Sequence, residues 1–283
     1  MTKTKVLFLG NCQISAVAHI LNLDHNLFDV SVISIHLPSE QEVILRSIKD
    51  SDIIITQRIR SSYGYASTKE VLINKQEQAK IIIFNSCFMK FYYFDTQYLV
   101  VDKKLIERPT AYHHKSVIDN YKSSKTTQEC INQYICNKDL MNENQLLFIL
   151  NNDIEQLSIR YQDMINIINK DKNISIIDIK KFILENYNKQ LLFYSFNHPT
   201  GILLKYIVDN IMNILNFSHN ISDNLEVLGE TRCILYSCLH KLLDFNILNH
   251  EPNINKLTNI DSIVQQYYLE YDNVFGNKTL DIY

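Results

Sequence analysis

Two patterns of hydrophobic and polar positions alternate along the first part of the chain. Short apolar runs, three continuous and one alternating, have the length and β-branched content of strands. They cover residues 4–9, 30–35, 52–56 and 80–84. The stretches between them carry apolar residues at helical spacing, and they cover residues 14–23, 40–49 and 66–78. Strands that alternate with helices in this way predict a parallel, doubly wound sheet with helices on both faces.

The pattern changes near residue 110, where long segments of helical period begin. They lie at residues 115–136, 144–170, 175–187, 201–216 and 222–245. The best strand signal among them is 190–194. The tyrosine-rich segment 265–271 is expected to pack on its own domain, and the alternative is that it covers a partner subunit. We expect an α/β fold with an N-terminal doubly wound, mostly parallel sheet over residues 1–110 and a largely helical C-terminal half over residues 111–283. No linker rich in Pro, Gly or Ser separates the halves, so we expect them to share one core.

The turn after the first predicted strand reads Gly10-Asn11-Cys12-Gln13. Ligands of open α/β sheets bind beyond the carboxyl ends of the strands. Cys12 is expected at a helix N-terminus, whose partial positive charge lowers a thiol pKa and favours the nucleophilic thiolate. Gly10 allows the turn, and the amides of Asn11 and Gln13 are candidate donors to an oxyanion or phosphate. The alternative is a buried cysteine that acts as a small apolar side chain.

A second polar segment, Asn197-His198-Pro199, separates a strand-like run from a strongly helical stretch. Pro199 suits the first turn of that helix. An Asn-His pair at such a boundary can position a general base or acid, so His198 is a candidate catalytic residue and Asn197 a candidate substrate ligand. The alternative is that Asn197 or His198 caps the helix.

Further polar residues follow the third and fourth predicted strands. Gln57 and Arg58 come after the third strand, and Asn85 and then Lys90 come after the fourth. The topological rule brings these groups to the same crevice as Cys12. Gln57 and Asn85 are candidates for hydrogen bonding, whereas Arg58 and Lys90 are candidates for binding an anion.

Two adjacent histidines, His113 and His114, stand between Arg108 and Lys115. Adjacent side chains point in different directions on a strand or a helix, so this pair is a poor metal site. We predict a loop that contacts substrate or phosphate, and a solvated loop is the alternative.

Composition and missing motifs exclude several classes of protein. The net charge of −3 argues against a nucleic-acid binder that works through a basic surface. The six cysteines have no CxxC spacing, which argues against a disulfide framework and a structural metal. The sequence lacks the GxGxxG, Walker, HExxH and GxSxG motifs. No apolar run approaches the roughly 20 residues of a membrane span or resembles a secretory signal, so we expect a cytoplasmic protein.

Three of these segments together resemble the WcbI family of capsular polysaccharide biosynthesis enzymes. They are Leu9-Gly10-Asn11-Cys12-Gln13, Ile55-Thr56-Gln57 and Phe196-Asn197-His198-Pro199-Thr200, preceded by the run at 176–183. The likeness extends over roughly residues 4–216. The family is bacterial and is associated with coenzyme A binding and with acetyl transfer onto capsule sugars, and Cys12 and His198 are the positions that match.

The resemblance implies a CoA-dependent O-acetyltransferase that uses acetyl-CoA as co-substrate, needs no metal and acts on a glycan precursor. Residues that could bind the cofactor are Arg58, Asn85, Lys90, Arg108, His113 and His114. In one version Cys12 attacks the thioester, and in another His198 deprotonates the sugar hydroxyl while Cys12 lines the thiol end of CoA. Association with the capsule assembly machinery and homo-oligomerisation both stay open.

Three alternative functions use the same residues differently. A thiol-type hydrolase or deacylase would use water as the acceptor. A sulfotransferase would take its group from a 3′-phosphoadenosine donor and would not need the thiol. A non-catalytic accessory protein of capsule assembly would bind CoA or a nucleotide without turnover.

Overall fold

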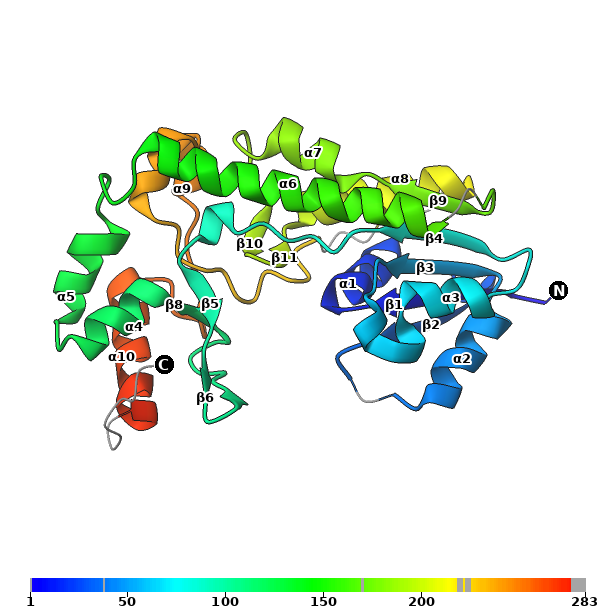
Figure 1. Ribbon diagram of the computed structural model, residues 1–283, viewed down its shortest axis with the longest axis horizontal. Helices are drawn as coiled ribbons and strands as arrows, with labels where there is room; N and C mark the ends of the chain where they lie inside the picture. The colour runs from blue at the N-terminus through cyan, green and yellow to red at the C-terminus, as the bar shows by residue number, and fades with distance from the viewer. Residues whose placement is uncertain (1, 38, 169–170, 218–220, 222–224, 276–283) are drawn as a thin grey trace. The chain divides into compact units, whose positions relative to one another are not determined.

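The computed structural model describes residues 2–37, 39–168, 171–217, 221 and 225–275 (Figure 1). The chain forms two compact units. The first unit comprises Met1–Cys87, Ile154–Glu185 and Pro199–Leu228, and the second comprises Phe88–Asp153, Asn186–His198 and Gly229–Tyr283. Both units therefore combine residues from before and after residue 110.

A parallel sheet of five strands forms the centre of the first unit. Its strands are β1 (Thr4–Gly10), β2 (Phe28–Ser34), β3 (Ile53–Gln57), β4 (Lys80–Phe84) and β9 (Ile174–Ile177). They lie in the order β2-β1-β3-β4-β9, and each neighbouring pair is parallel. The predicted α/β fold is therefore confirmed. The strand order reverses between β1 and β3, which makes the carboxyl ends of these two strands the topological switch point.

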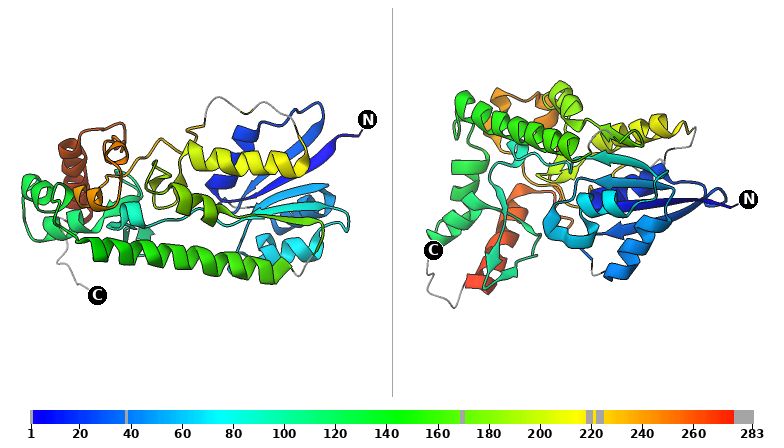
Figure 2. Two further views of the ribbon diagram at one scale, coloured as in Figure 1. Left: turned by 90° about the horizontal axis from the view of Figure 1, so that it is seen from above. Right: turned by 45° about the vertical axis from the view of Figure 1, so that its right-hand side comes forward.

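Helices cover both faces of this sheet (Figure 2). On one face, α1 (Cys12–Leu21) packs against α8 (Gly201–Leu215). On the other face lie α2 (Gln41–Asp50), α3 (Thr68–Asn74) and the part of α6 (Glu143–Ile168) that begins at residue 154. Buried side chains from the strands pack there against buried side chains from these helices. They include Leu7, Ile54, Ile83, Ile48, Val71 and Met164. The central strands are continuous apolar runs because both of their faces are covered.

The fifth strand, β9, corrects one prediction. The segment 175–187 reads as a helix, but its first residues form β9, and the helix α7 (Ile179–Asn186) begins only afterwards. β9 pairs with β4 through Ile81↔Ile174 and the residues that follow. A short apolar run fits a buried strand as well as a buried helix, and here the open edge of the sheet decides between them.

The second unit contains helices and short strand pairs. The helices are the first part of α6, α4 (Lys115–Lys122), α5 (Thr127–Cys130), α9 (Phe245–Leu248) and α10 (Ile260–Phe275). The strand pairs are β5 (Thr96–Tyr98) with β8 (Tyr112–His114), β6 (Val100–Val101) with β7 (Lys104–Leu105), and β10 (Phe193–Ser195) with β11 (His198–Pro199). Shorter turns are η1 (Ser61–Ala66) in the first unit, and η2 (Phe91–Tyr93), η3 (Ile131–Ile135) and η4 (Ser237–Lys241) in the second. Among the described residues, no helix has the length and apolar character to cross a membrane.

Two predicted helices differ from the structure. The segment 115–136 is divided into α4, α5 and η3, because Ser124 adopts a left-handed conformation and a Thr126–Glu129 capping box starts a new helix. The described part of 222–245 contains turns and η4. Its backbone pairs with distant segments instead: the N–H of Cys233 donates to the carbonyl of Tyr194 at 2.7 Å. These long-range bonds replace helical ones.

Tyrosine and histidine rings fill the core of the second unit. Tyr267 and Tyr271 of α10 are completely buried, and Tyr267 donates its hydroxyl to the backbone carbonyl of Tyr112 at 2.5 Å. The ring of His113 lies 5.5 Å from that of Tyr267 and 5.7 Å from that of Tyr271. The prediction that the tyrosine-rich segment packs on its own domain is confirmed.

Candidate functional site

The first candidate site is the turn between β1 and α1. β1 ends at Gly10, Asn11 is the N-cap residue, and Cys12 is the first residue of α1. The side chain of Asn11 accepts a hydrogen bond of 2.9 Å from the N–H of Gln13. The turn thus lies at the switch point and places the thiol of Cys12, which is partly exposed, at a helix N-terminus.

Two buried glutamines hold this turn in place. Gln57, the last residue of β3, accepts a 3.0 Å bond from the N–H of Asn11 and donates a 2.8 Å bond to Oε1 of Gln13. Gln13 in turn donates to the carbonyl of Cys87 at 2.8 Å and accepts from the N–H of Cys87 at 2.9 Å. Each glutamine is only 1% exposed. They link the ends of three chain segments, so we propose that they position the turn.

Glycine is required at position 10 because neighbouring side chains lie too close to its Cα atom for a Cβ atom to fit, and not because of a positive φ. A Cβ atom at this position would lie 2.6 Å from Oε1 of Gln57 and 3.0 Å from Cβ of Ile14. Any larger residue would therefore displace the glutamine that holds the turn.

Burial dominates the electrostatics of Cys12. It raises the pKa of the thiol above its ordinary value, although hydrogen bonds from the N–H groups of Gln13 and Cys12 itself act in the opposite direction. The first turn of α1 contains no acidic residue that would oppose the helix dipole. The lowering of the thiol pKa that the sequence suggested is nevertheless outweighed by desolvation.

The second candidate site surrounds His198. The hydroxyl of Tyr112 donates to Oδ1 of Asn197 at 2.8 Å and lies 3.1 Å from Nε2 of His198. Asn197 also donates to the hydroxyl of Tyr98 at 2.9 Å and accepts from the hydroxyl of Ser195 at 3.1 Å. Since Tyr112 directs its hydrogen toward Asn197, its oxygen accepts from His198, so Nε2 carries the hydrogen and Nδ1 the lone pair.

The free nitrogen of His198 carries an unprotonated lone pair at neutral pH, which is the form that a general base requires. Nδ1 is buried and makes no hydrogen bond to any residue that the structure describes. Burial lowers the pKa of His198 to about 4, so the imidazole is neutral at pH 7. Thr200, and not Asn197 or His198, is the N-cap of α8, which removes the capping alternative.

Side chains of the second unit line a cavity of about 750 Å³ next to His198. Its lining includes Glu107, Tyr112, His198, Glu230, Asn253 and Lys256. Two of these residues lie in segments that the sequence indicated: His198, and Tyr112 in the segment between Arg108 and Lys115. The other lining residues lie at irregular sequence separations, and no motif marks them.

The predicted anion-binding residues have different surroundings. Arg58 forms an ion pair with Asp163 at 2.9 Å, so a carboxylate already balances its charge. Asn85 is buried, and its Oδ1 has no hydrogen-bond partner among the described residues. Lys90 is exposed at the start of η2, and Arg108 is exposed before a cis bond to Pro109.

The loop predicted around the two histidines is wrong. His113 and His114 belong to β8 and are completely buried. His113 contacts the hydroxyl of Tyr271 at 3.0 Å and the carbonyl of Ile106 at 3.1 Å. Burial lowers the pKa of both histidines, that of His114 to about 4. Because the tyrosine-rich core encloses the two rings, we do not retain them as cofactor ligands.

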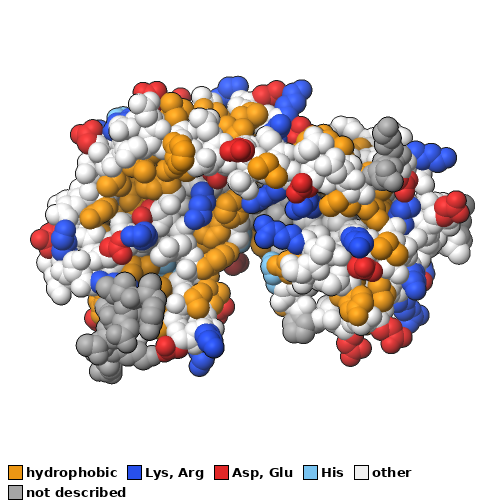
Figure 3. All heavy atoms as spheres, in the orientation of Figure 1, with side chains coloured by type: hydrophobic (Ala, Val, Ile, Leu, Met, Phe, Trp, Pro, Cys, Tyr) orange, Lys and Arg blue, Asp and Glu red, His pale blue; other side chains and the backbone are white. Residues whose placement is uncertain are grey.

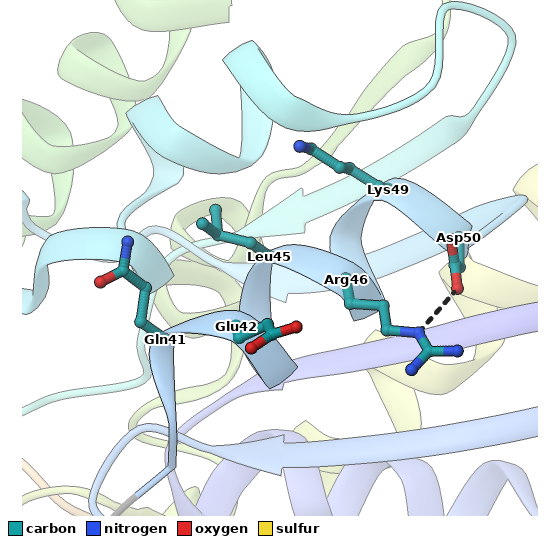
Figure 4. A pocket seen from close by; sticks show the side chains of 6 residues that line it. All are labelled: Gln41, Glu42, Leu45, Arg46, Lys49 and Asp50. Atoms are coloured by element: carbon teal, nitrogen blue, oxygen red, sulfur yellow. Dashed lines mark ion pairs between the residues drawn. The ribbon is translucent and has the colours of Figure 1, made fainter.

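The first unit has further surface pockets whose side chains do not form a recognisable catalytic or binding group. One follows the outer face of α2 and is lined by Gln41, Glu42, Leu45, Arg46, Lys49 and Asp50 (Figure 4). Arg46 and Asp50 form an exposed pair at 3.6 Å there, which is typical of a solvated helix face. Acidic and basic side chains are interspersed on the face shown in Figure 3. In the part of the chain that the structure describes, no three His, Cys, Asp or Glu side chains form a group that could hold a metal ion.

The two predicted catalytic residues lie in different units, Cys12 in the first and His198 in the second. Their cooperation in one reaction therefore stays a prediction. Gly10 and Asn11 precede Cys12, and Asn197 precedes His198.

Comparison with known proteins identifies the family. Residues 5–220 match the family described as the polysaccharide biosynthesis enzyme WcbI. A solved WcbI structure shares the fold with a TM-score of 0.75 and 18% sequence identity, over 98% of this chain and 96% of that chain. It is described as a novel polysaccharide biosynthesis enzyme, in a native form without a disulfide bond between coenzyme A and one of its cysteines. The comparison with curated proteins gave no match. The family match, which spans most of the sequence, shows that this chain belongs to the WcbI family of polysaccharide biosynthesis enzymes.

Proposed function

We propose that the protein transfers an acyl group, with acetyl as the first candidate, from acyl-CoA to a hydroxyl of a capsular or surface glycan precursor. The observation that carries this proposal is the neutral imidazole of His198, whose Nδ1 is unpaired among the described residues while Tyr112 fixes its tautomer. Family membership supports a polysaccharide substrate, and the coenzyme A mentioned for the solved WcbI structure supports the donor.

The proposed reaction uses His198 as a general base. Nδ1 takes the proton of the acceptor hydroxyl as the oxygen attacks the thioester carbonyl. The C–S bond then breaks, and the proton passes from the imidazolium to the departing CoA thiolate. The products are an O-acylated glycan and CoA. Tyr112 keeps the accepting nitrogen deprotonated beforehand because it occupies Nε2.

We assign the turn around Cys12 to the acyl donor. Gly10, Asn11 and Cys12 lie at the switch point, where open α/β sheets bind ligands. The helix N-terminus there favours negative charge, such as that of a thioester oxygen under attack. Gln13 and Gln57 contribute by fixing the turn.

The phosphates of CoA need basic groups that no carboxylate neutralises. Lys90 and Arg108 are exposed, and we propose them as the phosphate ligands. Arg58 is a weaker candidate because Asp163 pairs with it. Asn85 can contribute through its unpartnered side-chain oxygen, which would accept a hydrogen from the donor.

Of the two catalytic routes, we favour direct transfer. A covalent route needs a Cys12 thiolate, but burial raises the pKa of this thiol. In the direct route Cys12 lines the thiol end of CoA. Incubation with acetyl-CoA alone, followed by intact-protein mass spectrometry, distinguishes the routes: an acetyl adduct that disappears in Cys12→Ala would establish the covalent route.

The decisive experiment supplies acetyl-CoA with a panel of nucleotide sugars and oligosaccharides and measures CoA thiol release together with product mass. We expect acetylated sugar, and a loss of about 100-fold or more in kcat for His198→Ala. His240→Gln, at an exposed histidine, is the matched control. Equal CoA release without acceptor would indicate a hydrolase. CoA binding without turnover would indicate an accessory protein, and transfer only from a 3′-phosphoadenosine donor would indicate a sulfotransferase.

A further inference from the structure

The cavity beside His198 has the size and polarity of a small-molecule site. Its volume of about 750 Å³ falls within the roughly 300–1,000 Å³ of ligand pockets. Residues from four separate stretches of the second unit line it. A site assembled from distant segments can hold a ligand from several sides.

Two lining residues have a buried acceptor atom without a partner. These atoms are Nδ1 of His198 and Oδ1 of Asn253, and neither makes a hydrogen bond to a residue that the structure describes. A buried polar atom that lacks a partner is costly, so such atoms are rare unless a ligand or ordered water satisfies them. Both atoms accept hydrogen bonds, so the complementary ligand is rich in donors.

The backbone around Asn253 is fixed although its side-chain oxygen is unpaired. Asn253 and Arg232 exchange two backbone hydrogen bonds, of 2.8 and 2.9 Å. A two-residue turn follows directly, closed by two 3.0 Å bonds between Ile254 and Leu257. Asn253 is thus held in place by main-chain contacts, while its buried amide oxygen makes no hydrogen bond to a described residue.

The turn itself has an unfavourable conformation that glycine would adopt more easily. Asn255 and Lys256 have φ values of 53° and 67°, and both line the cavity. Left-handed backbone is uncommon for residues other than glycine and asparagine, and it is concentrated at functional sites. Lys256 thus presents a charged side chain at the cavity from a backbone conformation that residues other than glycine adopt infrequently.

The charged lining residues favour hydroxyl groups over anions. Glu107 and Glu230 are exposed at the cavity, and neither forms an ion pair with a described residue. Carboxylates accept hydrogen bonds and repel other carboxylates and phosphates. Lys256 adds one positive charge, so acidic groups outnumber basic ones in the lining.

We infer that this cavity binds the acceptor as an uncharged pyranose, with hydroxyls donating to His198, Asn253 and the two carboxylates. Its role as the acceptor site rests on the proposed function, whereas sugar binding does not. A pyranose offers several O–H donors on one ring, which matches the excess of acceptors. A uronic acid or sugar phosphate would place its negative charge beside Glu107 and Glu230.

The test measures binding without CoA, so that it does not depend on turnover. Methyl glycosides of glucose, galactose and mannose are titrated by NMR, with methyl glucuronide and glucose 6-phosphate as charged counterparts. We expect at least one neutral glycoside to bind, and its charged counterpart to bind about fivefold or more weakly. Failure of every neutral glycoside to bind, or equal binding of the charged ones, would overturn the inference.

Variants locate the binding. Asn253→Ala removes the unpaired oxygen and is expected to weaken binding about fivefold, whereas Asn249→Ala, at an exposed site, serves as control. Lys256→Gly removes a lining side chain that can donate to a sugar oxygen and also relieves the left-handed turn, so we expect weaker binding with an undiminished melting temperature. Unchanged binding in both variants would show that the sugar does not bind in this cavity. If sugar binding persists but no acyl transfer is found, the proposed function fails and the binding site stands.

Discussion

The hydroxyl of Tyr112 lies 3.1 Å from Nε2 of His198, although 86 residues separate them in the sequence. This contact leaves Nδ1 as the only nitrogen of the ring that can take a proton. Tyr112 is therefore a positioning residue for the proposed base. Its effect on catalysis can be separated from its effect on folding.

Tyr112→Phe is expected to lower kcat about tenfold or more with little change in KM, because the imidazole can then adopt the wrong tautomer. Tyr134→Phe, at a half-exposed tyrosine, is the control. Steady-state kinetics from pH 5 to pH 8 provide the measurement. A proportional loss in kcat and in folded protein would instead mean that Tyr112 acts only through stability.

Three histidines make the fold sensitive to mild acid. Burial lowers the pKa of His114, His198 and His250 to about 4 each, against an ordinary value of 6.5. The unfolded chain takes up protons near pH 6.5, whereas the folded chain does so only near pH 4. The stability that these neutral histidines contribute is therefore fully present above pH 6.5 and is lost as the pH falls toward 4. The free energy of unfolding falls by about 1.4 kcal/mol per pH unit for each histidine at most.

His114→Phe tests this prediction, since a phenyl ring can keep the contacts with Tyr236 and Tyr267 but cannot take up a proton. Urea unfolding at pH 7 and pH 5 should show a smaller loss of stability in the variant than in the natural protein. Asp95, which lies 4.0 Å from His114, partly opposes the lowering of its pKa. His240→Gln, at an exposed histidine, is the control, and an equal slope in all three proteins would refute the assignment.

The sequence predicted the sheet and the Cys12 turn because both arise from local patterns. Continuous apolar runs at β1, β3 and β4 require burial on both faces, and Gly10-Asn11-Cys12 combines a close-packed glycine with an N-cap. β9 was missed because its short apolar run becomes a strand only where β4 offers an open edge.

The contacts that define the site come from tertiary structure instead. Gln13 bonds to Cys87 across 74 residues, so its inward direction has no local signal. His113 and His114 read as a polar loop, because nothing near them in the sequence shows the ring of tyrosines from α10 that encloses them. A polar residue in a sequence is expected at the surface unless a nearby partner is evident. Gln13, His113 and His114 are buried because their partners come from distant parts of the chain.

The chemical reactivity of Cys12 follows from its burial. Because desolvation raises the pKa of the thiol, its alkylation by iodoacetamide should be slower at pH 7 than that of free cysteine, and should rise with pH beyond the ordinary thiol range. Site-resolved mass spectrometry measures the rate. Bound CoA should protect Cys12 but not the exposed Cys136. Rapid alkylation of Cys12 at pH 6 would show an activated thiolate and would revive the covalent route.

Gly10 and Gln57 provide the sharpest test of how the turn is held. Gly10→Ala places a Cβ atom 2.6 Å from Oε1 of Gln57, which forces the glutamine away from Asn11 and Gln13. We expect a loss of about 1–3 kcal/mol in unfolding free energy. In a Gln57→Ala background the main clash is gone, so the same substitution should cost less, with a coupling of about 0.5 kcal/mol or more. Urea denaturation of the four proteins gives this coupling directly. Additive losses would mean that the glycine is needed for its neighbour Ile14 rather than for the glutamine.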